Sequence, residues 1–68
     1  MDLNLLRTFV SIYETHNLTT TATALRVTQP SVSHALSRLR AQFGDPLFLR
    51  KRQGMQPTTL ATELYGVF

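Results

Sequence analysis

The sequence predicts a mainly α-helical fold, in which three helices form the core and a short β-hairpin stands beside them. Three observations support this prediction. Apolar residues recur at helical spacing near the N-terminus, and residues 19–40 have the pattern of a short helix, a tight turn and a longer helix. Residues 47–57 contain two strand-like segments around a glycine turn. The 68 residues suffice for one small domain with a small core.

The first helix is expected over residues 2–15, with Asp2 at its start, where a negative charge is favourable. Two adjacent apolar stripes run along it, and such a helix usually packs against two surfaces. One stripe contains Leu3, Leu6, Val10 and Tyr13, and the other contains Leu5, Phe9 and Ile12. We expect one stripe to face the core and the other to face a partner helix or a second subunit. His16 and Asn17 are expected to end the helix as ordinary polar residues.

A second, shorter helix is expected from Thr20 to Leu25, with Thr19 as its N-cap. Its three threonines give it a poor intrinsic helix propensity, so tertiary packing must hold it in place. Residues 26–28 form the turn that follows, and we expect Val27 to be inserted into the core.

The third helix is expected to begin after Thr28, its N-cap, and to run to about Phe43, where Gly44 ends it. At about 100° per residue, one face is apolar and the opposite face carries small and polar residues. The apolar face contains Val32, Leu36, Leu39 and Phe43, whereas the opposite face contains Pro30, Ser33, His34, Ser37 and Ala41, flanked by Arg38 and Arg40. Ordinary surface helices favour Glu and Lys, which this outer face lacks. Its small residues would allow a close approach to another surface.

A β-hairpin is expected next, with Leu47–Arg50 as one strand and Met55–Pro57 as a short edge strand. The turn between them is Lys51-Arg52-Gln53-Gly54, in which glycine can adopt a positive φ. Thr58 is then expected to cap a fourth helix. One side of that helix carries Leu60, Ala61, Leu64 and either Val67 or Phe68, and we expect it to be the start of a longer helix.

The charge distribution favours a nucleic-acid partner. The net charge is +3 and the isoelectric point is about 10.2. Five of the seven cations lie between positions 38 and 52, namely Arg38, Arg40, Arg50, Lys51 and Arg52. A basic cluster on such a domain is an electrostatic footprint for nucleic acid, although charge alone also fits a solvated face.

Several other functions are not expected from this sequence. It has no cysteine, its two histidines are far apart, and no carboxylate cluster accompanies them, so neither disulfide nor metal site is predicted. No nucleophile–base pair, carboxylate pair or phosphate loop is present, so we expect no enzyme and no catalytic, cofactor-binding or metal-binding residues. No apolar run approaches a membrane span and no secretory signal is recognised, so a cytoplasmic protein is expected.

Three stretches in register carry a resemblance to a known family. They are MDLNLLRTFVSIYETHNLTTTATAL at the start, VTQPSVSHALSRLRAQFGDPLF in the middle, and RKRQGMQPTTLATEL over the hairpin and fourth helix. Together they cover essentially the whole chain, which resembles the N-terminal DNA-binding domain of LysR-type bacterial transcriptional regulators.

The resemblance implies a winged helix-turn-helix over residues 1–58 and the start of a linker and dimerisation helix over residues 59–68. It also implies a cytoplasmic, nucleoid-associated homodimer that binds an interrupted palindrome in double-stranded DNA. Full-length members carry a C-terminal effector-binding domain, which is absent here, so no cofactor is expected in this part and a small-molecule inducer only for that domain. The alternative is a winged-helix module that binds proteins.

The resemblance also assigns residues to roles. The expected DNA contacts are Thr19, Thr28, Gln29, Pro30, Ser31, Ser33, His34, Ser37, Arg38, Arg50, Lys51 and Arg52. Gln29 could pair with adenine, and arginine is common in the family where His34 stands. Arg40 replaces a frequent acidic residue and is expected to add a phosphate contact. The expected dimer contacts, from the first and fourth helices, are Leu5, Phe9, Ile12, Leu60, Leu64, Val67 and Phe68.

Overall fold

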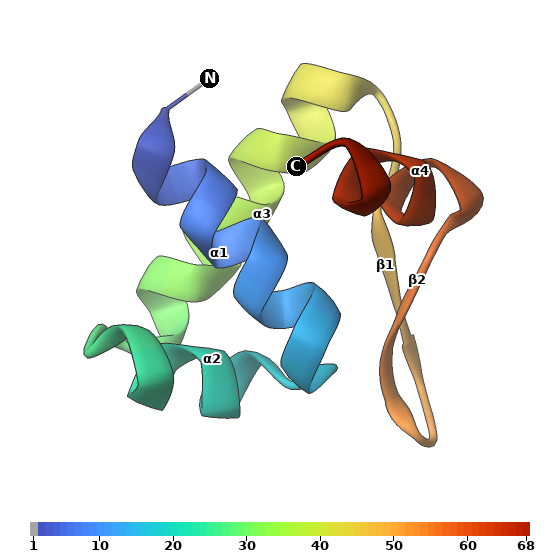
Figure 1. Cartoon of the computed structure of the whole chain (residues 1–68). Helices are drawn as coiled ribbons and strands as arrows, with labels where there is room; N and C mark the ends of the chain where they lie inside the picture. The colour runs from blue at the N-terminus through green and yellow to red at the C-terminus, as the bar shows by residue number, and fades with distance from the viewer. Residues whose placement is uncertain (1) are drawn as a thin grey trace.

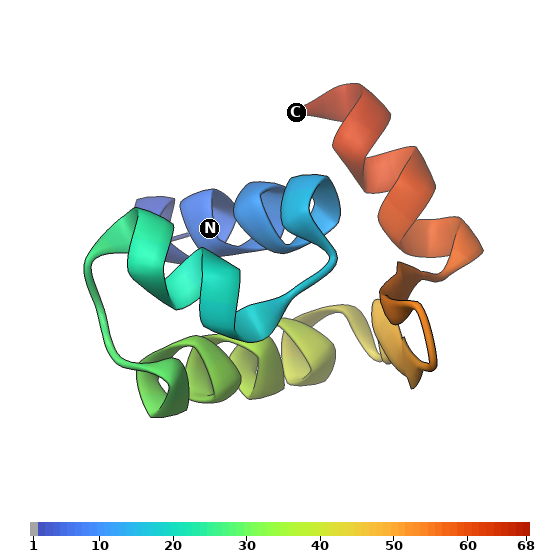
Figure 2. The ribbon, with the colours of Figure 1, turned by 90° about the horizontal axis from the view of Figure 1, so that it is seen from below.

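The computed structural model describes residues 2–68 and has the predicted mainly helical architecture (Figure 1). Within these residues lie four helices and one antiparallel hairpin. The elements are α1 (Leu3–Thr15), α2 (Leu18–Leu25), α3 (Gln29–Phe43), β1 (Phe48–Lys51), β2 (Gly54–Pro57) and α4 (Thr59–Val67). In Figure 2, α1 and α3 lie in two layers with α2 packed across them, and the hairpin and α4 stand at the other end.

Every helix and both strands contribute side chains to one core. Its buried apolar members are Leu5, Phe9, Ile12, Leu18, Ala22, Val32, Leu36, Leu39, Leu47, Phe48, Met55 and Ala61. The predicted inner face of α3 is confirmed, with Val32, Leu36 and Leu39 buried and Phe43 half-buried. Because this face is buried, the opposite side of α3 is turned to solvent.

The helices begin at side chains that accept a backbone N–H of the first turn. Thr28 and Thr58 cap α3 and α4 as predicted, and Gly44 ends α3 with a φ of 61°. The predicted cap of α2 is wrong, because Asn17 takes that role and accepts from the Thr20 N–H at 2.8 Å. Thr19 therefore lies inside the first turn of α2, where its side chain is exposed.

The stripe of α1 that faces the core is Leu5, Phe9 and Ile12. Phe9 and Ile12 are completely buried, and the Phe9 ring lies 5.4 Å from the Phe48 ring. The expectation that these three residues form a dimer contact is therefore wrong, since their side chains are occupied within their own domain. In the other stripe Leu3 is 68% exposed, whereas Leu6, Val10 and Tyr13 are half-buried.

The turn between α2 and α3 differs from its prediction. Arg26 ends α2 in the left-handed region, with a φ of 60°, and the next N–H, of Val27, bonds to the Ala22 carbonyl at 3.0 Å. This closing geometry leaves the Val27 side chain 46% exposed rather than inserted into the core.

In the hairpin, β1 is shifted by one residue from its predicted bounds, and β2 begins one residue earlier but ends at Pro57 as predicted. Phe48 pairs with Pro57 and Lys51 pairs with Gly54, so the turn is only Arg52-Gln53. Leu47, predicted as the first strand residue, precedes the strand as a fully buried residue with a φ of 63°. Gly54 has the predicted positive φ, at 115°.

Candidate nucleic-acid interface

The outer face of α3 presents the predicted base-reading residues together. Gln29, Pro30, Ser33, His34 and Ser37 line one shallow depression on this face. Three of these side chains, Pro30, Ser33 and Ser37, are small, so a flat partner could approach the helix axis closely. This is the surface that burial of the opposite face leaves available.

Gln29 is oriented by its neighbour on the next turn of the helix. Its Nε2 donates to the Ser33 Oγ at 3.2 Å, and both side chains are half-buried. One N–H and the carbonyl oxygen of the Gln29 amide remain available to a partner. A donor and an acceptor side by side are what the N7 and N6 edge of adenine requires.

The beginning of α3 is a cluster of hydroxyl groups. The Thr28 Oγ1 accepts from the Ser31 N–H at 3.3 Å and lies 2.9 Å from the Ser31 Oγ. Both residues are exposed. Free N–H groups and hydroxyls at a helix start are groups that can bind a phosphate.

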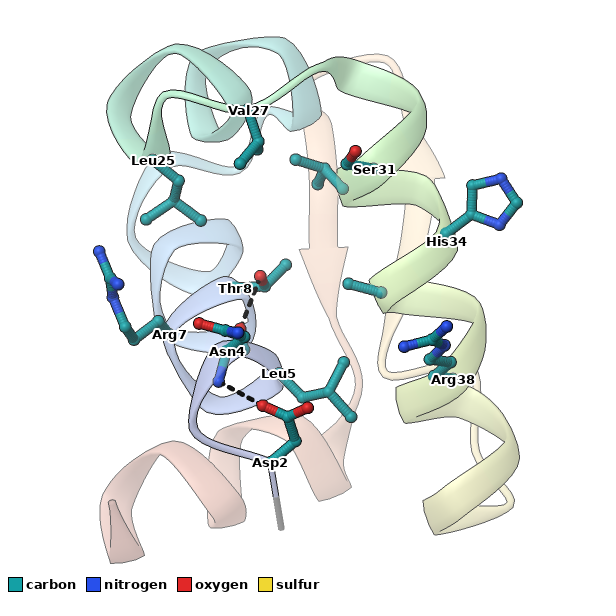
Figure 3. A pocket seen from close by; sticks show the side chains of 12 residues that line it. Asp2, Asn4, Leu5, Arg7, Thr8, Leu25, Val27, Ser31, His34 and Arg38 are labelled. Carbon is teal, nitrogen blue, oxygen red and sulfur yellow. Dashed lines mark hydrogen bonds between the residues drawn. The ribbon is translucent and has the colours of Figure 1, made fainter.

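His34 and Arg38 lie one turn apart on α3, and both are exposed. Figure 3 shows the His34 ring pointing away from the groove between α1 and α3, whereas the Arg38 guanidinium stands at the edge of that groove. The groove has an apolar floor and a polar rim. It is lined by Asp2, Asn4, Leu5, Arg7, Thr8, Leu25, Val27, Ser31, Val32, His34, Ala35 and Arg38.

Arg40 does not share the outer face with these residues. Its Nε donates to the Pro46 carbonyl at 2.8 Å, and its Nη2 donates to the Phe48 carbonyl at 2.8 Å. The guanidinium therefore connects α3 to the base of β1. The expectation of a phosphate contact is corrected, because the side chain is half-buried and already bonded to the backbone carbonyls of Pro46 and Phe48.

The hairpin of residues 48–57 is called the wing below. Its three cations are exposed, but they do not point the same way. Arg50 and Lys51 belong to β1, and Arg52 lies in the turn. Successive side chains of a strand point to opposite faces, so Arg50 lies on the face of Phe48 and Lys51 on the other. Only Arg52 occupies the loop itself.

The sequence did not predict the structural role of His16. Instead of merely ending α1, it adopts a φ of 58°, and its carbonyl accepts from the Met55 N–H at 2.8 Å. Its Nδ1 also lies 2.9 Å from the Met55 carbonyl. His16 thus holds β2 to the end of α1. The two residues are 39 positions apart, so no local pattern could have revealed the contact.

Some of the α4 residues that were expected at a dimer contact pack against the core of their own domain. Leu60 and Leu64 are half-buried against the core, whereas Val67 is 80% and Phe68 45% exposed. Tyr65 further ties α4 to α1, because its ring stacks on Tyr13 with centroids 4.0 Å apart.

The Tyr65 hydroxyl donates to the Glu14 Oε2 at 2.7 Å. This hydrogen bond raises the pKa of Tyr65 above its ordinary value of 10.0, and desolvation adds to the effect. The shift belongs to the packing of α4 rather than to the outer face of α3.

Residues 2–68 contain no group of three or more His, Cys, Asp or Glu side chains that could hold a metal ion. None of the helices in the described part of the chain has the length and apolar character needed to cross a membrane.

Comparison with known proteins gives a consistent picture. Residues 3–62 match the model of the bacterial regulatory helix-turn-helix proteins of the lysR family. The chain is 44% identical over 66 residues to the HTH-type transcriptional regulator LeuO of Escherichia coli strain K12, covering 97% of this chain and 21% of LeuO. The chain therefore spans about a fifth of the length of the curated relatives it matches.

Two solved complexes with DNA have the same fold. The CbnR_DBD–DNA complex superposes with a TM-score of 0.91 at 25% sequence identity, covering 98% of this chain and 77% of that one. The BenM_DBD complex with catB site 1 DNA gives a TM-score of 0.91 at 28% identity, covering 98% and 75%. The relatives are named as transcriptional regulators and not as enzymes, which agrees with the sequence prediction.

Proposed function

The chain belongs to the LysR family of bacterial regulatory helix-turn-helix proteins, and we propose that it recognises an interrupted palindrome in double-stranded DNA as a homodimer. DNA binding in transcription regulation is the activity of the matched domain, and two similar domains have been solved on DNA. The observation that carries the proposal is the outer face of α3, where Gln29, Ser33 and His34 converge on one accessible surface.

In this mechanism α3 enters the major groove. Gln29 presents its free amide oxygen and N–H to a base edge, while Ser33 fixes the rotation of that amide. His34 and Ser37 follow along the same face. Arg38 and the hydroxyls of Thr28 and Ser31 contact phosphates, which sets the register without reading the sequence.

The wing extends this contact along the duplex. Arg50, Lys51 and Arg52 are exposed on two faces and the turn of the hairpin, so they can meet the backbone or the adjacent minor groove. Arginine suits a narrow minor groove in an A·T tract because the negative potential is enhanced there. Thr19, in the exposed first turn of α2, supplies a further phosphate contact.

Dimerisation is assigned to α4. Val67 at its end is 80% exposed and Phe68 next to it is 45% exposed although its ring packs edge-on against Phe9, so apolar surface is left for a second copy. Leu60 and Leu64 lie at the edge of the core beside it. A two-fold dimer places two copies of α3 about 34 Å apart, or a multiple of that distance, in successive major grooves. Half-sites related by two-fold symmetry follow from this arrangement.

The remaining parts of the proposal concern the intact protein. Because this chain spans about a fifth of its curated relatives, an inducer would act through chain outside these residues. A regulator of this kind would work on the nucleoid in the cytoplasm.

Selection from a random pool of double-stranded DNA at about 100 mM salt, where non-specific phosphate contacts are partly screened, tests the proposal. We expect enrichment of two half-sites related by two-fold symmetry. Enrichment of a single half-site would contradict the dimer but keep base reading. Uniform recovery with a shallow salt dependence would contradict DNA recognition and favour a protein-binding module instead.

A further inference from the structure

The wing is held to the domain at both of its outer edges. A two-stranded hairpin is marginal by itself in water, and each strand here has only four residues. In an antiparallel pair, hydrogen-bonded and non-hydrogen-bonded residue pairs alternate. The Thr58 N–H donates to the Leu47 carbonyl, so the next pair, which contains Phe48, is a non-hydrogen-bonded one, and so is the pair that contains Met55. The backbone N–H and C=O groups of Phe48 and Met55 therefore point away from the partner strand. His16 bonds to the outward groups of Met55, and Arg40 bonds to the outward carbonyl of Phe48.

Arg40 spans the segment in which the chain changes direction from α3 to the wing. Its two hydrogen bonds go to Pro46 and Phe48, on either side of Leu47. Leu47 has a positive φ that a leucine rarely adopts, and it is fully buried. Such a conformation persists only where the surroundings over-determine it, and the planar fork of a guanidinium is suited to fixing two carbonyls at once.

The orientation of this segment determines where the wing tip lies. Lys51 lies three residues beyond Phe48, about 10 Å along the strand, so a tilt of about 20° at the base displaces the tip by about 3 Å. A displacement of that size exceeds the tolerance of a hydrogen bond to a phosphate. Small changes at the base therefore decide whether the wing cations and α3 reach the same stretch of DNA.

We propose that Arg40 is a positioning residue of the DNA-binding surface, which sets the angle of the wing relative to α3 without contacting DNA itself. This inference rests on the proposed function for its DNA role. The geometry on which it depends can be measured without DNA.

The first test measures the wing in the free domain. Residual dipolar couplings of the amides of residues 48–56, relative to those of residues 31–43, report the angle between wing and helix. Arg40→Met keeps the aliphatic stem and removes both hydrogen bonds, so we expect the angle to change. Arg40→Lys, which can reach one carbonyl only, covers the case in which the Met variant does not fold, and should also alter the angle. Unchanged couplings in the folded variants would overturn the inference, and Arg38→Gln is the matched control that should leave the angle intact.

The second test is a double-mutant cycle on duplex DNA obtained from the selection. Arg52→Gln should weaken binding and reduce the salt slope by about one unit in the wild-type background, but have little further effect in Arg40→Met. Arg38→Gln should have the same effect in both backgrounds, because α3 itself is not displaced.

Equal effects of Arg52→Gln in both backgrounds would overturn the positioning role. They would mean that Arg52 still contacts DNA when Arg40 is replaced, so that the hydrogen bonds of Arg40 stabilise the domain only locally. If the wild-type domain shows no salt-dependent affinity for duplex DNA, the proposed function fails and the DNA role of Arg40 fails with it. The couplings would still decide whether Arg40 sets the angle of the wing, so the two failures are distinguishable.

Discussion

The helix α3 and the wing are held in place by different kinds of contact. α3 is defined by its own sequence, with a capping threonine at one end, a left-handed glycine at the other and three buried residues at helical spacing. The wing is anchored by its own buried Phe48 and Met55 and also by two residues outside it, His16 and Arg40, which bond to its outer edges. A surface of the first kind should tolerate single changes better than a surface of the second kind, and variants of the two regions test this difference.

The largest effect is expected at the base of the wing, where the hairpin enters the core. Phe48 is completely buried against Phe9, so Phe48→Ala should destabilise the domain by about 3–5 kcal/mol, which is most of the stability of a domain this small. Chemical denaturation followed by circular dichroism measures this. Leu49→Ala, the next residue of the same strand and 43% exposed, is the control and should change stability little. Similar losses for both variants would show that the base of the wing is not part of the core.

The next effect is expected at Gly54, where the wing approaches the end of α1. A Cβ there would lie 2.6 Å from the His16 carbonyl oxygen, and the φ of 115° disfavours any side chain. Gly54→Ala should therefore cost about 3 kcal/mol, at the upper end of the range for a strained backbone position.

Gly44→Ala provides the matched control in the same denaturation experiment. Gly44 also has a positive φ, but a Cβ there meets nothing within 4 Å, so the loss should be only about 1 kcal/mol. A loss at Gly54 no greater than at Gly44 would mean that the close approach to His16 does not constrain the wing.

The elements governed by local pattern could be predicted from the sequence. The apolar face of α3, its cap at Thr28 and its end at Gly44 all follow from side chains within the helix or next to it. The pattern of α1 predicted two apolar stripes but could not show which one faces the core, because both fit a helix equally well. That choice depends on Phe48, which lies far away in the sequence and packs on Phe9.

The candidate interface divides in the same way. The residues on the outer face of α3 were predictable, since they are simply those opposite the buried ones. Arg40 was not, because its position on α3 placed it at the flank of that face, whereas two carbonyls beyond the helix engage its guanidinium. His16 was missed for the same reason, as its partner Met55 is brought to it only by the fold.

A smaller effect distinguishes residues that contact bases from residues that contact phosphates. Gln29→Ala should cost about 1–3 kcal/mol at the preferred site and relax the base preference at one position, with little change in the salt slope. Arg52→Gln should weaken binding to all sequences alike and reduce the salt slope by about one unit. Titrations against matched and mismatched duplexes at several salt concentrations measure both. If Gln29→Ala left discrimination between sites intact, the base-reading role of the α3 face would be wrong.

The smallest effect concerns the attachment of α4 to α1. The Tyr65 hydroxyl donates to Glu14, so the protonated form is favoured in the folded domain and the pKa of Tyr65 is raised above 10.0. This contribution is present below pH 10.0 and is lost as the pH rises through the raised pKa, because an ionised Tyr65 would repel the carboxylate. Ultraviolet titration of tyrosinate should show one residue that ionises late, and Glu14→Gln should bring its pKa back toward the ordinary value. Because Tyr65 lies outside α3 and the wing, Glu14→Gln should not alter the DNA affinity per domain at neutral pH. A loss of affinity in this variant would mean that the placement of α4 is coupled to the DNA-binding surface.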